Sequence, residues 1–198
     1  ANTSASAAAP RAIMPIPASD TSPIHAAPAT VIAVEVPAAL DWRERLATLA
    51  ELTKPRITRL VTITAAVGFT MAALGRTWDF AHLVMAAIGC LVGTALSASG
   101  ANALNMWWER RRDARMVRTA HRPLPERRIT PHAAFFAGMT FSISGVLCLL
   151  VLAGPAPALV SLVTILWYVL LYTPLKPITP LNTLVGAVPG ALPPLIGW

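Results

Sequence analysis

The chain has 198 residues, of which 55% are hydrophobic and 13% charged, and its mean hydropathy is +0.59. A soluble domain usually carries about twice that share of charge, so the composition excludes an ordinary soluble protein. The net charge of +7 does not indicate nucleic acid as a partner, because the arginines adjoin apolar stretches instead of forming a soluble basic domain. Basic residues beside apolar segments are typical of the cytoplasmic flanks of membrane spans.

Residues 1–40 are rich in Ala, Pro and Ser and have no periodic apolar face. Such a segment buries too little surface to offset the entropy lost on ordering, so we expect a disordered Ala/Pro-rich tail. Repeated prolines interrupt its apolar residues, which argues against a signal peptide. The first residue is Ala, so the natural start need not lie here.

Residues 41–53 are predicted to form a short amphipathic helix. Trp42, Leu46 and Leu49 lie on one side, and charged residues flank them. This pattern favours a helix that lies on the membrane surface.

Five apolar segments follow, at residues 57–74, 81–104, 133–153, 156–172 and 181–198. The first three are long enough for a transmembrane helix, which needs about 20 residues, and the fourth is at the short end of the range. Glycines and prolines interrupt the fifth, which predicts a kinked or broken span. The predicted fold is therefore an all-α, polytopic transmembrane helix bundle over residues 41–198 with about five spans.

The charges of the connections predict the orientation of this bundle. Arginine is abundant between the second and third spans, and basic residues also precede the first span and follow the fourth. The alternate connections hold only Arg76 with Asp79, and the uncharged Gly154-Pro155. The positive-inside rule places every basic connection in the cytoplasm. The two cysteines, Cys90 and Cys148, lie inside apolar runs without metal-type spacing and are interpreted as small apolar side chains.

The stretch from Asn102 to Leu124 holds the most informative polar pattern. If the second helix continues past Leu104, Asn105, Glu109 and Asp113 fall at i, i+4 and i+8. Four residues turn about 400° on a helix, so the three side chains share one face. An amide and two carboxylates form a hard oxygen-only site, of the kind that Mg²⁺ prefers.

Two arginines follow this row, Arg118 and Arg122, and could contact phosphate oxygens from the other side. Metal on some oxygens and guanidinium groups on others would suit a diphosphate. The alternative is that Glu109 and Asp113 only balance the charge of neighbouring arginines, since such pairs are common and weak. Acidic residues so near a bilayer tend to be functional, and Asn105 is not needed for charge balance, which favours the metal site.

Four segments resemble a known family. The Asn-x3-acid-x3-Asp row with the following RT and RPL resembles the first aspartate-rich motif of the intramembrane aromatic prenyltransferase (UbiA-type) superfamily. Three further segments resemble its heme O synthase branch, the protoheme IX farnesyltransferases. They are LTKPRIT at 52–58, YTPLKPITPLN at 172–182 and GAVPGALPPLIGW at 186–198. The resemblance covers roughly residues 50–198 and is most branch-specific in PPLIGW.

The resemblance implies a bundle, commonly of about nine spans, whose cytoplasmic cap binds a Mg²⁺-bound prenyl diphosphate. In this branch a farnesyl group passes from farnesyl diphosphate to a vinyl group of heme b, and water adds to give heme O. The implied metal ligands are Asn105, Glu109 and Asp113. The implied diphosphate-binding residues are Arg118, Arg122 and Lys176, with Lys54 as a further basic candidate. A bacterial inner membrane is the expected location, with lipid and with heme A synthase or oxidase-assembly proteins as further partners.

Two departures from the family pattern qualify these expectations. The middle metal position is often Asp but is Glu109 here, which is tolerable if the helix lies slightly farther away; nothing explains the arginine triplet before Asp113. Family members also carry a second aspartate-rich motif in a later cytoplasmic loop, and this chain ends at Trp198 before it. We therefore expect this chain by itself to be inactive and to be part of a longer protein.

Other residues have two readings each. His25, His82, His121 and His132 could ligate heme iron, and His121 is the best placed, but a lone loop histidine is usually a solvated polar residue. Trp107 and Trp108 could face an isoprenoid or a forming cation, although interface tryptophans are more often membrane anchors.

Small residues and prolines in the spans also suggest structural roles. Gly93, Ser97 and Gly100 are expected to allow close helix packing. Pro193 and Pro194 are expected to shape a broken helix beside the substrate cavity.

Two other functions remain open. The first is a prenyltransferase for another acceptor, such as 4-hydroxybenzoate or a chlorophyllide-like ring, because the metal row and arginines would be shared. The second is a non-catalytic membrane protein, such as a transporter subunit or an oxidase-assembly factor, in which the arginine loop would bind lipid or a partner.

Overall fold

The computed structural model describes residues 41–198, so the predicted tail and His25 fall outside the described residues. Every regular element in this range is helical, which confirms the predicted fold class. The elements are α1 (Trp42–Leu52), α2 (Pro55–Leu74), α3 (Phe80–Ile88), η1 (Gly89–Gly93, a π-helical segment), α4 (Thr94–Asp113), α5 (Pro131–Leu152), α6 (Pro155–Leu166), η2 (Trp167–Tyr172, also π-helical), α7 (Thr173–Leu175), α8 (Asn182–Ala191) and α9 (Pro193–Gly197).

Four helical stretches are long and apolar enough to cross a membrane. They are Pro55–Leu74, Phe80–Asp113, Pro131–Leu152 and Pro155–Leu175. The second runs without interruption through α3, η1 and α4, so the predicted extension past Leu104 is confirmed. The fifth apolar segment is helical but divided: α8 has 10 residues and α9 has 5, with Leu192 between them. Neither piece is long enough to span alone, and a proline starts the second piece because proline fits the first turn of a helix.

Proline and glycine also determine where the spans begin. Thr130 caps α5 by accepting a hydrogen bond from the Ala133 backbone N–H, and Pro131 occupies the first turn. Gly154, at φ 104°, makes the sharp connection between α5 and α6, where an L side chain would be strained. Pro155 then starts α6.

The interface between α4 and α5 depends on small residues, as expected for helices that associate in lipid. A methyl group at Gly100 would overlap Ser142 of α5, and one at Gly93 would overlap Leu149. Ser97 lies between them and accepts a hydrogen bond from Ser161 of α6 at 2.9 Å. The predicted packing role of Gly93, Ser97 and Gly100 is confirmed.

The face of α1 that packs against the bundle differs from the apolar face, Trp42–Leu46–Leu49, that the sequence pattern indicated. Trp42 and Leu46 are 62% and 56% exposed, so they remain free to meet a membrane surface. Thr48 and Leu52 are buried instead, and Leu49 packs against the same cluster. This inner face joins α1 to α4 and to the loop before α5.

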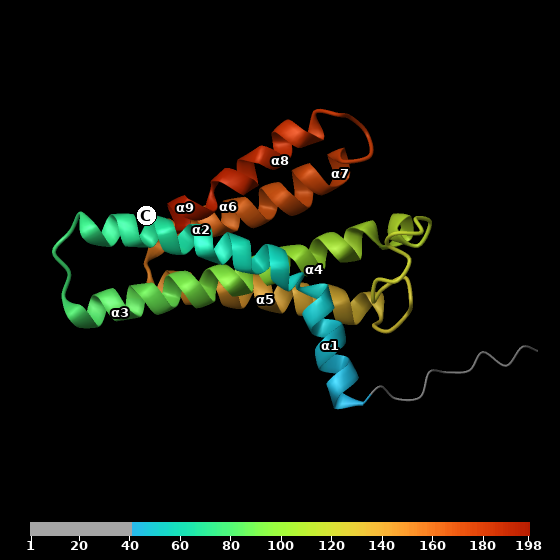
Figure 1. Cartoon of the computed structure of the whole chain (residues 1–198), viewed down its shortest axis with the longest axis horizontal. Helices are drawn as coiled ribbons and strands as arrows, with labels where there is room; N and C mark the ends of the chain where they lie inside the picture. Colours follow the sequence, from blue (N-terminus) through green and yellow to red (C-terminus); the bar gives the residue numbers. More distant parts are fainter. Residues whose placement is uncertain (1–40) are drawn as a thin grey trace, which may run out of the picture. The chain divides into compact units, whose positions relative to one another are not determined.

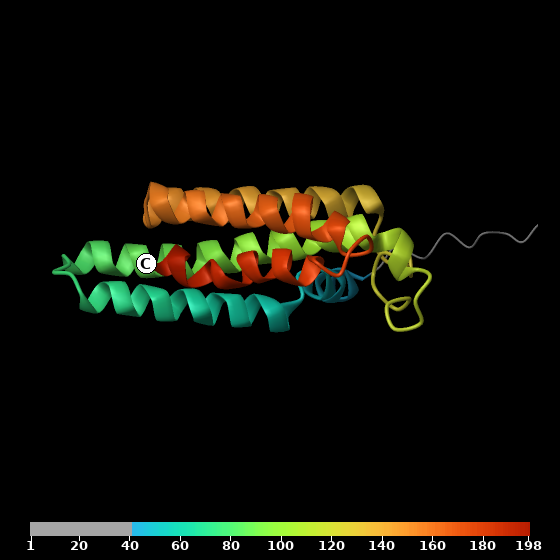
Figure 2. The same ribbon diagram turned by 90° about the horizontal axis from the view of Figure 1, so that it is seen from above.

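The polar connections gather at one end of the bundle. The loop 114–130 lies at the right-hand end of the bundle in Figure 1, with α7 and the α1–α2 junction in the same half, whereas the α2–α3 connection lies at the left-hand end. Figure 2 shows the same separation from above.

Cys90 is buried and Cys148 half-buried, and neither forms a disulfide within the described part of the chain, in agreement with their predicted apolar role.

Candidate functional site

The predicted polar row lies on one face of α4, and that face is buried. Asn105, Glu109 and Asp113 are only 2%, 5% and 4% exposed. The helix continues through Asp113 and therefore keeps the three side chains in line. Burying a charged carboxylate costs free energy unless a cation or a hydrogen-bond donor is paired with it, so the partners of Glu109 and Asp113 are central to the site.

Lys54 binds the first member of the row. Its ammonium Nζ donates to Asn105 Oδ1 at 2.9 Å. The residue has left-handed backbone angles, φ 48° and ψ 69°, directly before Pro55, and this turn between α1 and α2 points its side chain inward. The pKa of Lys54 is lowered from 10.5 to about 8, first by burial and then by the cations Arg122 and Lys176, whose effect outweighs the opposing charge of Glu109 and Asp113.

Lys176 binds the second member. It follows α7, and its Nζ donates to Glu109 Oε1 at 2.9 Å. The same short helix supplies Thr173, which is fully buried and accepts a hydrogen bond from Asn105 Nδ2 at 3.0 Å. The end of the fourth span is therefore held against the row at two points.

Arg122 binds the third member. Its Nη1 lies 2.7 Å from Asp113 Oδ2 and 3.9 Å from Glu109 Oε2, so one guanidinium group reaches both carboxylates. Thr119, buried in the same loop, donates its hydroxyl hydrogen to the Asp113 carbonyl oxygen at 3.0 Å. These contacts fold the loop 114–130 back over the end of α4.

Three cations from three segments thus meet one row of oxygen ligands. Lys54 and Lys176 are the only lysines in the chain, and both lie here although 122 positions separate them. Residues 41–198 contain no group of three or more His, Cys, Asp or Glu side chains that could hold a metal ion. A metal at the row would therefore need oxygens from a ligand to complete its coordination.

The remaining sequence candidates are not brought to the row. Arg118 is exposed and makes no ion pair with any residue that the structure describes. His121 is exposed and lies 3.2 Å from Glu126, and His82 pairs with Asp79 beside the start of α3, at the far end of the Phe80–Asp113 helix. His132 is exposed in the first turn of α5.

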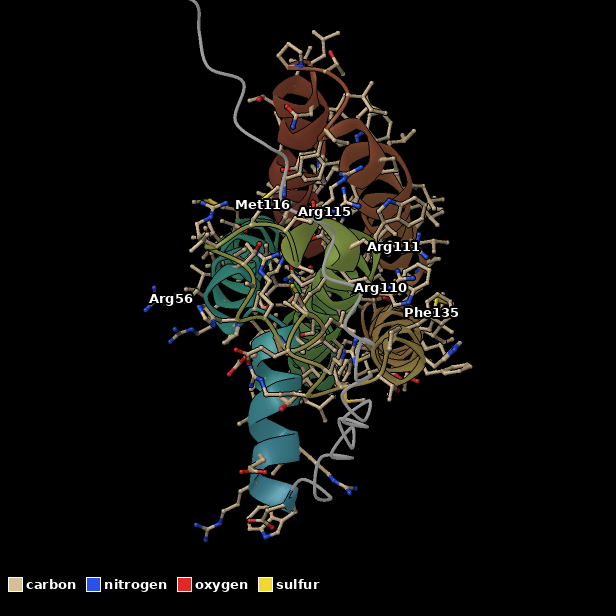
Figure 3. All side chains as sticks on the ribbon, turned by 90° about the vertical axis from the view of Figure 1, so that its right-hand side faces the viewer. Arg56, Arg110, Arg111, Arg115, Met116 and Phe135 are labelled. Carbon is tan, nitrogen blue, oxygen red and sulfur yellow. The ribbon has the colours of Figure 1, made fainter. Side chains whose placement is uncertain are left out.

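The two tryptophans line a groove between α4, α5 and the fourth span. Trp107 is half-buried between Arg110, whose guanidinium carbon lies 4.9 Å from the ring centre, and Phe135, whose ring centre is 4.9 Å away. The groove is about 350 Å³, and Trp108 lies at it with 41% exposure. Figure 3 looks onto the end of the bundle that carries the loop 114–130. It shows Arg110, Arg111 and Phe135 on the same side, while Arg56 points outward on the opposite side.

A larger cavity, of about 570 Å³, lies between α2, α4, the fourth span and α8–α9. Its wall includes Asn102, one turn before Asn105, and continues down α4 to Ser97 and Thr94. Pro193 also lines it, as expected for a proline that shapes a broken helix beside a cavity. The polar row therefore lies close above a mainly apolar space.

Two supporting residues were missed by sequence reasoning. Thr173 anchors Asn105, and Asn102 donates to the Thr53 carbonyl and to Thr58 Oγ1, both at 3.3 Å, which holds the turn that carries Lys54. Asn102 precedes Asn105 by three residues and so extends the polar stripe by one turn. That spacing was the available signal; Thr173 had none beyond its place in YTPLK.

The fold and the site are those of a membrane-embedded helical protein with a polar cap of acids and cations. The chain belongs to the UbiA prenyltransferase family, whose model matches residues 60–198. This confirms the family resemblance noted in the sequence.

Three of the relatives that the chain matches, each named protoheme IX farnesyltransferase, show the extent of the similarity. The one from Myxococcus xanthus is 44% identical over 151 residues, which are 76% of this chain and 49% of the relative. The one from an Anaeromyxobacter species is 41% identical over 170 residues, 86% of this chain and 54% of the relative. A mitochondrial one from Pyricularia oryzae is 39% identical over 168 residues, 81% of this chain and 30% of the relative.

The chain spans about half the length of the first two relatives. No solved structure gave a significant match.

Proposed function

We propose that this protein transfers a farnesyl group from farnesyl diphosphate to a vinyl group of heme b to give heme O. The observation that carries the proposal is the convergence of Lys54, Lys176 and Arg122 on one buried row of oxygen ligands. The names of the relatives support the choice of substrates. The family match argues against a transporter subunit or an assembly factor.

The donor set of the row fits Mg²⁺. All three side chains offer hard oxygen atoms, they share one helix face, and they lie at the end of a span instead of within lipid. Glu109, Asp113 and Asn105 would hold the ion together with diphosphate oxygens. When bound, Mg²⁺ supplies Lewis-acid withdrawal of charge from the leaving group.

The cations of the chain would hold the diphosphate itself. Each of the three already lies against an oxygen of the row, so a diphosphate placed there can take over their hydrogen bonds without large movements. Their positive charge favours departure of the diphosphate when the allylic C–O bond breaks. Arg118, which is exposed, could be added only if the loop moved.

The apolar part of the substrate fits the 570 Å³ cavity beneath the row. Its mainly apolar walls would limit the access of water to the allylic carbon. The farnesyl carbon then bonds to the outer vinyl carbon, a water oxygen bonds to the inner one, and diphosphate and a proton leave. The product carries a hydroxyethylfarnesyl group.

The same geometry supports a proposal for the location of the site. The row and its cations lie at the end of the bundle that gathers the basic connections, which the positive-inside rule assigns to the cytoplasm. We propose a bacterial inner membrane with the diphosphate bound on the cytoplasmic side. Heme A synthase or oxidase-assembly proteins are the proposed recipients of the product.

The test is binding of farnesyl thiodiphosphate, a slowly reacting analogue, to the full-length protein in membranes with and without Mg²⁺. Glu109→Gln and Asp113→Asn should each remove the Mg²⁺-dependent part of binding. Asp79→Asn, which removes an acid beyond the other end of the same helix but preserves its cap, should not. Heme O formation is then measured by chromatography; Mg²⁺-independent binding, or prenylation of a hydroxybenzoate in place of heme, would contradict the proposal.

A further inference from the structure

The side chain of Arg128 makes an unusually complete set of hydrogen bonds. Its Nη1 and Nη2 donate to the two carboxylate oxygens of Glu51 on α1, at 3.1 and 2.6 Å. Its Nε donates to Glu126 at 2.9 Å, and Nη2 also donates to the His121 carbonyl oxygen at 3.1 Å. The hydrogen bonds to Glu51 raise the pKa of Arg128. A two-pronged arginine–carboxylate pair within a network is stronger than an isolated surface pair.

These contacts bracket Arg122, the residue that holds Asp113. The Arg128 side chain binds the carbonyl of His121, just before Arg122. Its backbone N–H donates to the carbonyl of Pro123, just after Arg122, at 2.9 Å. The Glu126 backbone N–H donates to the Arg122 carbonyl itself at 3.1 Å. The backbone around Arg122 is therefore held on both sides.

A left-handed residue allows this arrangement. Arg127 has φ 59°, which turns the chain so that Arg128 points back toward residues 121–123. Leu124, inside the turn, is 6% exposed and packs with Leu52 of α1 and Met106 of α4. The ion pair thus closes over an apolar contact between the same two segments, α1 and the loop.

Helix α1 also leads directly to Lys54. Glu51 precedes that lysine by three residues, and Thr53 between them accepts a hydrogen bond from Asn102 of α4. One ion pair, Glu51–Arg128, therefore joins the segments that carry two of the three cations at the row. The Glu51–Arg128 pair lies closer to the surface than the row, since the Arg128 side chain is 29% exposed and the Glu51 side chain is 49% exposed.

We propose that Arg128 is a positioning residue that, anchored on Glu51, keeps the Arg122 guanidinium in place for a bound diphosphate. The inference rests on the proposed function for its ligand, and the ion pair has no direct contact with the row. Loss of the pair leaves Arg122 free to move with its loop. The affinity for the diphosphate then falls because ordering that loop opposes binding.

The test is a double-mutant cycle in the full-length protein in membranes, with the dissociation constant of Mg²⁺–farnesyl thiodiphosphate as readout. Arg128→Gln and Glu51→Gln should each weaken binding about tenfold, and the double variant should be no weaker than Arg128→Gln alone. In an Arg122→Gln background, Arg128→Gln should have no further effect, because it acts through Arg122. Arg127→Gln, the same charge change at the exposed neighbour, is the matched control.

Two results would overturn the proposal. The first is an equal loss from Arg128→Gln in both backgrounds, which would indicate general destabilisation. The second is unchanged hydrogen–deuterium exchange at residues 119–124 in Arg128→Gln relative to Arg127→Gln. The exchange measurement needs no ligand, so if no variant binds the diphosphate the proposed function fails while the exchange still decides the role of Arg128.

Discussion

Lys54 Nζ lies 2.9 Å from Asn105 Oδ1 although the two residues are 51 positions apart in the chain. The contact joins the turn between α1 and α2 to the buried face of α4. It places an ammonium group where its charged form is disfavoured, by burial and by two neighbouring cations. Such an arrangement suits an anion-binding site, because the negative charge of a bound diphosphate would stabilise the charged form of Lys54.

The pKa of Lys54 gives a first prediction. Below about pH 8 the ammonium is charged in the folded and unfolded protein alike, and its burial lowers the free energy of unfolding. This destabilisation is relieved as pH rises from about 8 to 10.5, where only the unfolded state keeps the proton. Reductive ¹³C-methylation of the full-length protein should give a Lys54 NMR signal, assigned by its loss in Lys54→Arg, that titrates near pH 8 in Mg²⁺-free buffer. A midpoint near 10.5 would contradict the buried position.

The left-handed backbone of Lys54 gives a second prediction. A non-glycine residue in this conformation is strained by about 1 kcal/mol, and the following proline disfavours it further. Lys54→Gly should therefore raise the thermal midpoint of unfolding while it weakens binding of a farnesyl diphosphate analogue. Lys54→Arg keeps the charge and serves as the control, with little gain in stability. Equal binding by Lys54→Gly and the unaltered protein would show that the amine does not contact the ligand.

Lys176 and Glu109 give a third prediction, in which two affinities move in opposite directions. Lys176→Met removes the cation that occupies Glu109 Oε1, so the carboxylate becomes more available to a divalent ion. The affinity for Mn²⁺ alone, measured by electron paramagnetic resonance, should rise, whereas that for Mn²⁺ with diphosphate should fall about tenfold. Lys176→Arg should change both much less. If both affinities fall together, the lysine has a general structural role.

The α4–α5 interface gives a fourth prediction. A methyl group at Gly100 would overlap the backbone of Ser142, so Gly100→Ala must push the two helices apart and should cost about 2 kcal/mol. Gly190 in α8 has open space around it, and Gly190→Ala should be neutral or stabilising by roughly 0.5 kcal/mol. Unfolding of the protein in lipid nanodiscs measures both. A neutral Gly100→Ala would mean that the helices are not packed this closely.

Patterns local to one helix were predictable from the sequence. The spacing of Asn105, Glu109 and Asp113 predicted a shared face, and α4 runs through all three as expected. Small residues at 93, 97 and 100 predicted close packing for the same reason, since helix periodicity alone determines which positions face a neighbour. The face buried by α1 was less predictable. Trp42 and Leu46 formed an obvious apolar stripe, but Thr48 and Leu52 are the buried residues, and Leu52 packs against α4, the loop before α5 and the start of α5.

Contacts between distant segments were harder to foresee. Nothing in the local sequence separates Arg122, which binds Asp113, from Arg118, which remains exposed, because both follow the row in the same basic loop. The difference comes from how the loop folds back, with Thr119 and Leu124 buried and Arg127 in a left-handed turn. Arg128 and Glu51 show no motif at all.

The sequence by itself determined a membrane bundle, the positions of its helices and the acidic stripe on one of them, because apolar length and helical periodicity act over neighbouring residues. Only the tertiary structure decided which cations face that stripe. Lys54, Arg122 and Lys176 come from three segments whose meeting depends on helix packing and on two turns. Coulomb attraction becomes strong only after packing has brought the charges close together and removed water from between them.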